Sequence, residues 1–284
     1  MNSFKIKVPA TSANFGIGFD TLGVALDIYN EFEFEKSDSD VVLDFDTKFN
    51  NSNNLVLTSY KRFFTYFNIN YIPVTIKLIK NDVPESRGLG SSATCIVAGV
   101  LAANKIACTN KSSDELLALM TSIEGHPDNV APAYLGGFVA STVLENIVYP
   151  IKYNVSNKLI FNVYISPFKL STEEARKVLP LTYSRADVVH NLSRIVNLPY
   201  ALERGNYELL KVLLQDKIHE PYRIEIIEHA KELFDKIKKE EAIPLISGSG
   251  STILSISDKD IKVLDNYYKQ RKVQINTEGA IIYD

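Results

Sequence analysis

A run rich in glycine and serine, Pro84–Thr94, constrains this 284-residue chain more than any other feature of its sequence. Gly88 and Gly90 can adopt backbone conformations closed to other residues, and they let a ligand approach the main chain closely. Ser91 and Ser92 fall where an apolar helix is expected to begin, and a helix start offers free N–H groups and partial positive charge to an anion. The run therefore predicts a phosphate-binding loop that leads into a buried helix.

Two familiar phosphate-binding motifs do not match this run. The GxxxxGK[ST] loop requires a lysine before its hydroxyl residue, and the run contains none; the GxGxxG fingerprint fails because Ala93 occupies the third glycine position. Charge neutralisation at a bound phosphate must then rest on backbone N–H groups, the helix start and a metal ion. For the Gly-Leu-Gly part alone, a glycine-rich turn with serine caps is the alternative.

Apolar residues follow strand and helix periods in mixed order along the chain, without strict alternation of the two. That order favours an α+β fold over a doubly wound parallel sheet. Capping boxes at Ser112–Glu115 and Ser171–Glu174 mark two helix starts. The expected strands are 4–8, 24–36, 74–78, 138–144, 159–165, 244–246 and 252–256, and the expected helices are 55–67, the segment after Gly90, 113–124 and much of 172–239.

The composition is ordinary for a globular protein, with 45% hydrophobic and 23% charged residues. A net charge of -3 and evenly spread Lys and Arg argue against a nucleic-acid partner. No apolar run approaches the roughly 18 residues of a membrane span, and Met1–Lys7 lacks the apolar region of a signal peptide. Cys95 and Cys108 are interpreted as reduced core residues. We therefore expect a cytoplasmic protein with no membrane partner.

Four segments, in the same order along the chain, resemble the GHMP kinases (galactokinase, homoserine kinase, mevalonate kinase and phosphomevalonate kinase). Pro84–Thr94 is similar to their second signature, and Ser247–Gly250 to their third. Val8–Gly23 looks like the first signature in its homoserine-kinase form, and Glu124–Pro132 resembles the homoserine-kinase substrate segment. Together the matches cover nearly the whole chain, and four ordered matches are far more specific than any one of them.

The resemblance implies a two-domain GHMP kinase fold. Residues 1–150 would form an N-terminal domain like ribosomal protein S5 domain 2, which carries the ATP phosphate loop. Residues 151–284 would form a ferredoxin-like C-terminal domain, with the active site in the cleft between the two. Homoserine kinases are commonly dimers, so the resemblance also implies a homodimer, although no sequence feature marks an interface.

The activity implied by the resemblance is ATP-dependent phosphorylation of the side-chain hydroxyl of L-homoserine to O-phospho-L-homoserine, with ADP as co-product, in threonine biosynthesis. An arginine suits the substrate carboxylate because its planar fork donates paired, charge-assisted hydrogen bonds. Taken singly, Arg176 reads as a solvated helix charge, Asp20 as a turn residue and His126 as a helix cap. The resemblance implies that the amino-acid site is lined by Asn14, Asp20, His126, Arg176 and Arg223, with Thr172 close by.

The resemblance also implies ATP and Mg²⁺, with Ser92 and Glu124 as the metal ligands. Glu124 ends a predicted helix, where the dipole disfavours a carboxylate, so a nearby cation would resolve the misfit; a solvated glutamate is the alternative. Asn54 resembles a family position beside the adenine base, and a turn asparagine is the alternative. The implied ATP contacts are Asn54 and the loop residues Pro84, Glu85, Ser86, Arg87, Gly88, Leu89, Gly90, Ser91, Ser92, Ala93 and Thr94.

The catalytic base is left open. Several GHMP kinases place a lysine in the first signature, whereas here no lysine lies between Pro9 and Leu26. Our hypothesis is that no dedicated side-chain base exists and that the hydroxyl proton passes to a γ-phosphate oxygen or to solvent. Asn14 or Asp128 would orient the hydroxyl, but the sequence does not say whether Asp128 or Asn129 faces the substrate.

Two other functions compete with this interpretation. A GHMP kinase of the shikimate or mevalonate-pathway type would lack the paired Arg176 and Arg223. A non-catalytic small-molecule-binding protein on the same fold would lose the metal ligands or the phosphate loop, and both are present here.

Overall fold

Strand β2 (Leu22–Lys36) forms the centre of the first sheet and alternates side chains between the core and a wetter face, as its sequence predicts. Phe32 and Phe34 are fully buried, whereas Glu33 between them is only half-buried. The structure, a computed structural model, describes residues 3–284. The other strands of this sheet are β1 (Phe4–Ala13), β3 (Val41–Leu43), β4 (Val74–Asn81), β5 (Phe138–Leu144), β6 (Ile147–Tyr153) and β11 (Ile281–Tyr283).

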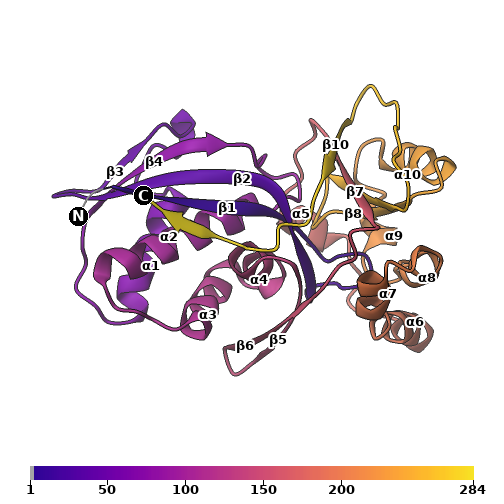
Figure 1. Cartoon of the computed structure of the whole chain (residues 1–284), viewed down its shortest axis with the longest axis horizontal. Coiled ribbons are helices and arrows are strands. Elements are labelled where there is room, and N and C mark those ends of the chain that lie inside the picture. Colours follow the sequence, from indigo (N-terminus) through magenta and orange to yellow (C-terminus); the bar gives the residue numbers. More distant parts are fainter. Residues whose placement is uncertain (1–2) are drawn as a thin grey trace.

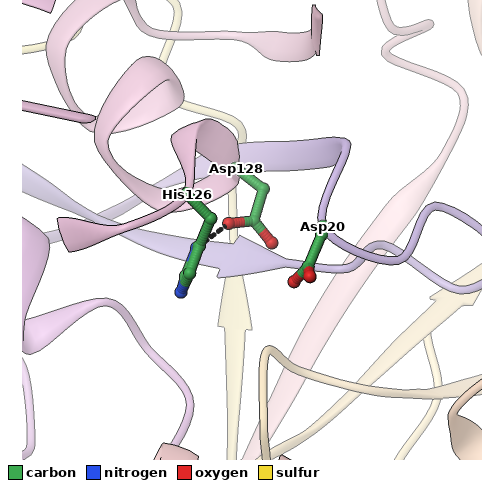
Figure 2. A group of neighbouring side chains, drawn as sticks. All are labelled: Asp20, His126 and Asp128. Carbon is green, nitrogen blue, oxygen red and sulfur yellow. Dashed lines mark hydrogen bonds and ion pairs between the residues drawn. The ribbon is translucent and has the colours of Figure 1, made fainter. Parts of the chain in front are cut away.

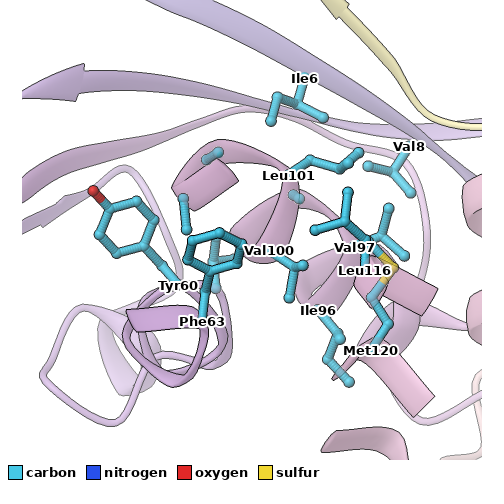
Figure 3. Packing of buried hydrophobic residues seen from close by; sticks show 14 of the residues in the cluster. Ile6, Val8, Tyr60, Phe63, Ile96, Val97, Val100, Leu101, Leu116 and Met120 are labelled. Carbon is cyan, nitrogen blue, oxygen red and sulfur yellow. The ribbon is translucent and has the colours of Figure 1, made fainter. Parts of the chain in front are cut away.

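Four helices cover one side of this sheet (Figure 1). The central one, α2, is buried on most of its faces, which confirms the interpretation of its apolar sequence. Figure 3 shows Val97 and Leu101 of α2 below Ile6 of β1, with Phe63 of α1 and Met120 of α3 beside them. The helices of this lobe are α1 (Leu55–Tyr66), α2 (Ser91–Ala107), α3 (Ser113–Glu124) and α4 (Pro127–Leu135), and a single 3-10 turn, η1 (Thr47–Phe49), precedes α1.

The second lobe is built on a four-stranded antiparallel sheet in the order β10-β7-β9-β8. Numbered within this lobe, the order is 4-1-3-2, which is that of a ferredoxin-like domain. The second crossover of that fold has no helix here, because residues 258–268 run as a loop. The strands are β7 (Ile160–Ile165), β8 (Ile243–Ile246), β9 (Ile253–Ser257) and β10 (Lys269–Val273), and the helices are α5 (Thr172–Lys177), α6 (Arg185–Ile195), α7 (Leu198–Arg204), α8 (Tyr207–Leu213), α9 (Glu220–Arg223) and α10 (Ala230–Lys239).

A shared hydrophobic core joins the two lobes. Phe15 and Leu22 from the first lobe pack in one cluster with Phe161, Leu245 and Leu254 from the second sheet. The opposite face of the second sheet packs against α10 in a separate cluster. Because both lobes contribute to the middle core, their relative position is set by apolar packing as well as by the chain connection.

The chain does not leave the first sheet at the expected boundary. The division between residues 150 and 151 falls within β6, and β11 returns at the end of the chain to pair with β1. The sequence did not predict β3, β6, β10 or β11. These strands are short or largely exposed, so their apolar pattern is weak.

The two cysteines differ in environment, and the interpretation of Cys108 as a core residue is wrong. Cys108 ends α2 in a left-handed conformation, which turns its side chain out to solvent. Cys95 lies near the other end of α2 and is partly buried, and burial raises the pKa of its thiol to about 12. Neither forms a disulfide. Of the helices formed by residues 3–284, none has the length and apolar character needed to cross a bilayer.

The contact between α1 and α2 yields a prediction that opposes helix propensity. A Cβ on Gly99 of α2 would lie 2.4 Å from the Val56 carbonyl oxygen and 2.9 Å from the Tyr60 nitrogen, both backbone atoms of α1. Propensity alone favours alanine by about 1 kcal/mol, but separating two packed helices costs about 1–3 kcal/mol. We expect Gly99→Ala to lower the free energy of unfolding in urea denaturation. The exposed Arg62→Ala on α1 serves as the control and should change it by less than about 0.5 kcal/mol.

Candidate active site

A cavity of about 370 Å³ between the lobes brings together most of the residues predicted from the sequence. Of the phosphate loop, the segment from Glu85 to Ser92 lines it. Pro84, Ala93 and Thr94 do not, because Ala93 and Thr94 turn into the core of the first lobe. The predicted residues outside the loop that line the cavity are Asn14, Asp20, Asn54, Glu124, His126, Thr172, Arg176 and Arg223.

The phosphate loop takes the backbone conformation for which its glycines were singled out. Gly88 has φ +72° and Gly90 has φ +69°, both in the left-handed region. Gly90 immediately precedes α2, so Ser91 and Ser92 form the first turn of that helix. The free N–H groups of this turn therefore face the cavity, as anion binding requires.

The glycine-rich turn Ser247–Gly250 of the second lobe, which resembles the third family signature, forms hydrogen bonds to the loop. The Ser247 hydroxyl donates to the Gly88 carbonyl oxygen at 2.6 Å, and the Thr252 N–H donates to the Arg87 carbonyl oxygen at 3.1 Å. No larger residue than glycine fits at position 88, since a Cβ there would lie 2.0 Å from the Ser247 carbonyl oxygen. The loop conformation thus depends on a contact between segments about 160 residues apart.

Arg87 anchors the loop to the second lobe. Its Nε donates to the Ser166 carbonyl oxygen at 2.7 Å and its Nη2 to the Pro167 carbonyl oxygen at 2.9 Å, while Nη1 donates to the Glu85 carbonyl oxygen. Each nitrogen of the guanidinium therefore already has a backbone acceptor. The sequence marked Arg87 only as part of an ATP-binding loop and gave no sign of this anchoring contact.

Ser92 and Glu124, the predicted metal ligands, lie side by side. The Ser92 hydroxyl donates to Glu124 Oε2 at 2.8 Å, between the start of α2 and the end of α3. Burial raises the pKa of Glu124, and the Ser92 hydrogen bond only partly offsets that effect. Within residues 3–284, no lysine or arginine forms an ion pair with Glu124. Two neighbouring oxygen ligands and an uncompensated carboxylate fit a hard divalent cation such as Mg²⁺.

Beyond Glu124, His126 and Asp128 form a hydrogen-bonded pair next to Asp20 (Figure 2). The ligand atoms of these three side chains lie within 4.8 Å of one another. Burial by itself lowers the pKa of His126, but the hydrogen bond and charge of Asp128, with Glu124 and Asp20 nearby, raise it above the usual value. The cavity is lined by Asn129, whereas Asp128 is buried beside it and also accepts the N–H of Asn14 at 3.3 Å.

The two arginines have different partners. Arg176 makes a two-fold ion pair with Asp20, at 2.9 and 2.7 Å, so neither side chain is a simple surface charge. Arg223 is only 1% exposed and donates from Nε to the Ala175 carbonyl oxygen at 3.2 Å and from Nη1 to the Gly248 carbonyl oxygen at 3.1 Å. Burial and the charge of Arg176 lower the pKa of Arg223 to about 10.

Arg223 has no carboxylate partner within the described part of the chain, and its Nη2 donates no hydrogen bond there. A buried cation without an anion is costly, because desolvation is not offset by a charge partner. The cavity is therefore lined by a buried positive group that has no ion-pair partner among residues 3–284. Such a group is suited to the carboxylate of a ligand.

The two asparagines of the site are engaged within the protein. Asn14 accepts the Asp20 N–H at 2.9 Å and donates to the Gly248 carbonyl oxygen at 2.9 Å. The second of these bonds connects the Val8–Gly23 segment to the Ser247–Gly250 turn. Asn54 caps α1 by accepting the Val56 and Leu57 N–H groups. Asn54 is therefore a helix-capping residue, close to the alternative of a turn asparagine, and its side chain also lines the cavity.

An apolar end of the cavity was not predicted. Phe45, Phe49 and Leu78 line it together with Phe32 of β2. The strand residues share the alternating pattern of ordinary core positions, and Phe45 and Phe49 stand in a polar segment without periodicity, so no sequence signal sets these residues apart. An apolar slot beyond a phosphate loop is suited to a flat base.

Comparison with known proteins agrees with this geometry. The family described as GHMP kinases N terminal domain matches residues 54–137. A homoserine kinase of Clostridium acetobutylicum is 43% identical over 260 residues, which cover 90% of this chain and 88% of that protein. The chain belongs to the homoserine kinase family. A crystal structure of homoserine kinase from Cytophaga hutchinsonii has a TM-score of 0.86 and 26% identity, and the match covers 99% of this chain and 98% of that one.

Membership of the homoserine kinase family confirms the predicted fold class, an α+β GHMP kinase fold, and the expectation of a kinase that uses ATP. Other GHMP enzymes are more distant. Phosphomevalonate kinase from Streptococcus pneumoniae has a TM-score of 0.72 at 15% identity over 96% of this chain and 100% of that one, so it shares the fold alone.

The loop geometry predicts that Gly88→Ala weakens ATP binding. The substitution forces a Cβ against Ser247 at a positive φ, and strain of about 1–3 kcal/mol corresponds to a loss of about tenfold or more in affinity. Titration calorimetry with ATP measures this effect. Gly205→Ala is the matched control, because Gly205 also has a positive φ (+63°) and a close contact (Ser156 Oγ, 2.7 Å) but lies outside the cavity. It should lower stability and leave ATP affinity unchanged; equal losses in both variants would contradict the prediction.

Proposed function

We propose that this chain transfers the γ-phosphoryl group of ATP to the side-chain hydroxyl of L-homoserine, forming O-phospho-L-homoserine and ADP in threonine biosynthesis. The observation that supports this most directly is that one cavity contains both the phosphate loop and the buried, carboxylate-free guanidinium of Arg223. A phosphate donor and an anionic acceptor can then be held side by side. Phosphoryl transfer depends mainly on such positioning and on charge neutralisation.

The acceptor would be held by its charged groups. We assign the substrate carboxylate to the free Nη2 of Arg223, and the ammonium group to the carboxylate of Asp20. Asp20 already pairs with Arg176, so the ammonium group would join an existing ion pair while the carboxylate neutralises Arg223. Thr172, the first residue of α5 on the cavity wall, would add a polar contact.

The donor would occupy the other half of the cavity. The N–H groups of the loop and of the α2 start receive the phosphates, and the slot at Phe45 and Phe49 receives the adenine. Asn54 acts there by capping α1 beside the slot. Ser92 and Glu124 would hold Mg²⁺, which supplies charge neutralisation at the phosphates.

The hydroxyl proton needs an acceptor, but the carboxylates assigned to the two ligands are already engaged: Asp20 pairs with Arg176, and Glu124 accepts the Ser92 hydroxyl. No lysine is among the lining residues of the described chain, and the Asp128 carboxylate is already engaged by His126 and by the Asn14 N–H. We therefore propose that no dedicated side-chain base acts, and that the proton passes to a γ-phosphate oxygen or to solvent. Asn14 and Asp20 then orient the acceptor.

Three further proposals concern the domain division, the cellular location and the oligomeric state. We propose two domains that meet near the end of β6, supported by the separate outer cores of the two lobes. We propose a cytoplasmic location, in keeping with the unpaired Cys95 and Cys108. A homodimer rests on the family resemblance alone, and sedimentation analysis tests it.

Arg223→Lys tests the acceptor site. Lysine keeps the charge but loses the fork, so we expect the KM for homoserine to rise about 10- to 100-fold with the KM for ATP unchanged. ADP release measured with homoserine, shikimate and mevalonate gives the specificity of the unchanged protein. Arg185→Lys, at an exposed position, is the control. Absence of homoserine-dependent ADP release by the unchanged protein would overturn the proposed function.

Glu124→Gln tests the metal site. The amide keeps the size of the side chain but removes the charge, so we expect kcat to fall by on the order of 100-fold and the Mg²⁺ concentration at half-maximal rate to rise. Rates measured over a Mg²⁺ titration show both effects. Glu203→Gln, an exposed glutamate of α7, should change neither. An unchanged Mg²⁺ dependence in Glu124→Gln would remove Glu124 from the metal site.

A further inference from the structure

We propose that His219 is a positioning residue of the carboxylate site: as a neutral imidazole with its proton on Nε2, it holds the Arg223 guanidinium in the orientation that receives the substrate. This inference rests on the proposed function, because it assumes an acceptor with a carboxylate. Neither His219 nor its contacts were singled out by the sequence. The residue does not line the cavity, and it would act only through Arg223.

The hydrogen-bond partners of the two ring nitrogens of His219 favour one protonation state. Its Nε2 lies 2.6 Å from the Gly16 carbonyl oxygen, which can only accept, so Nε2 carries a proton. Its Nδ1 lies 3.3 Å from Arg223 Nη1, which can only donate, so Nδ1 carries a lone pair. A proton on Nδ1 would place two N–H groups of two buried cations against each other. Burial lowers the pKa of His219; the carboxylate of Asp216, 3.8 Å from Nε2, opposes this shift, but the pKa remains below its usual value, in agreement with the neutral form.

The His219 imidazole is itself fixed in position, so it can orient the Arg223 guanidinium. His219 is fully buried, and its ring stacks on that of Phe19 at 5.5 Å and 28°. Asp216 accepts the His219 and Glu220 N–H groups at 2.6 and 2.8 Å, which fixes the start of α9. The ring therefore connects Gly16, in the Val8–Gly23 segment, to α9, the helix that carries Arg223.

These contacts decide which part of Arg223 is free. Nε is engaged by Ala175 and Nη1 by both Gly248 and His219, while the guanidinium carbon lies 5.1 Å from the centre of the Phe19 ring. Given the contacts made by residues 3–284, Nη2 is the one nitrogen left to donate to a ligand. A long side chain fixed before binding loses little conformational freedom when the carboxylate arrives, so the benefit appears as substrate affinity.

The test compares substitutions that keep different parts of the imidazole. His219→Asn places an amide oxygen near the position of Nδ1 and keeps an acceptor for Arg223. His219→Gln reaches Gly16 with its amide but loses that acceptor, and His219→Phe keeps only the ring that stacks on Phe19. We expect the KM for homoserine to rise about tenfold in His219→Phe and His219→Gln, with kcat within about threefold, and to change little in His219→Asn.

A second acceptor separates positioning from a general structural role. 3-Amino-1-propanol is homoserine without its carboxylate, so its kcat/KM should be the same in all three variants and the unchanged protein. The KM for ATP should also be constant. Thermal unfolding shows which variants are folded; if His219→Phe is not, the comparison of His219→Asn with His219→Gln on homoserine decides.

Two results would overturn the inference. One is an unchanged homoserine KM in His219→Gln, and the other is an equal loss with homoserine and 3-amino-1-propanol. Both differ from failure of the proposed function, in which the unchanged protein itself would not phosphorylate homoserine.

Discussion

The rest of the cavity depends on the hydrogen bonds of one turn, Ser247–Gly248. Its hydroxyl and backbone groups bind the Gly88 carbonyl oxygen of the phosphate loop and the Ala13 carbonyl oxygen of β1. Its own carbonyl oxygen at Gly248 receives hydrogen bonds from both Asn14 and Arg223. These are backbone groups and short or buried side chains, which leave little room for adjustment. One turn of the second lobe therefore places the Pro84–Thr94 loop and Arg223 relative to each other.

The charges around the cavity are arranged so that a ligand completes them. The half-buried Glu124 and the fully buried Arg223 both lack an ion-pair partner in the described chain, and burial displaces the pKa of each in the direction that disfavours its charge. Asp20 and Arg176, which also line the cavity, already neutralise each other. Buried charges without a partner cost stability, and a cation beside Glu124 and an anion beside Arg223, as proposed above, would offset that cost.

Much of this was predictable because it depends on local chemistry. The strands 138–144 and 24–36, the capping boxes and the left-handed glycines of the Pro84–Thr94 loop are specified by neighbouring residues, and the structure confirms them. Other features depend on residues far apart in the chain. Arg87 anchors the loop to carbonyl groups 79 and 80 residues away, and His219 contacts Gly16 across 203 residues. No periodicity or motif around Arg87 or His219 predicts a partner so far away in the sequence.

Local spacing and motifs in a set order are enough to predict the family, the α+β class, the glycine-rich loop and the residue types around the cavity. How those residues share their contacts depends on the tertiary structure. It engaged Arg176 with Asp20, left one edge of Arg223 free, turned Asn129 toward the cavity in place of Asp128, and closed the first sheet with β11. The physical reason is that hydrogen bonding and burial depend on which groups meet in space, and one-dimensional spacing does not carry that information.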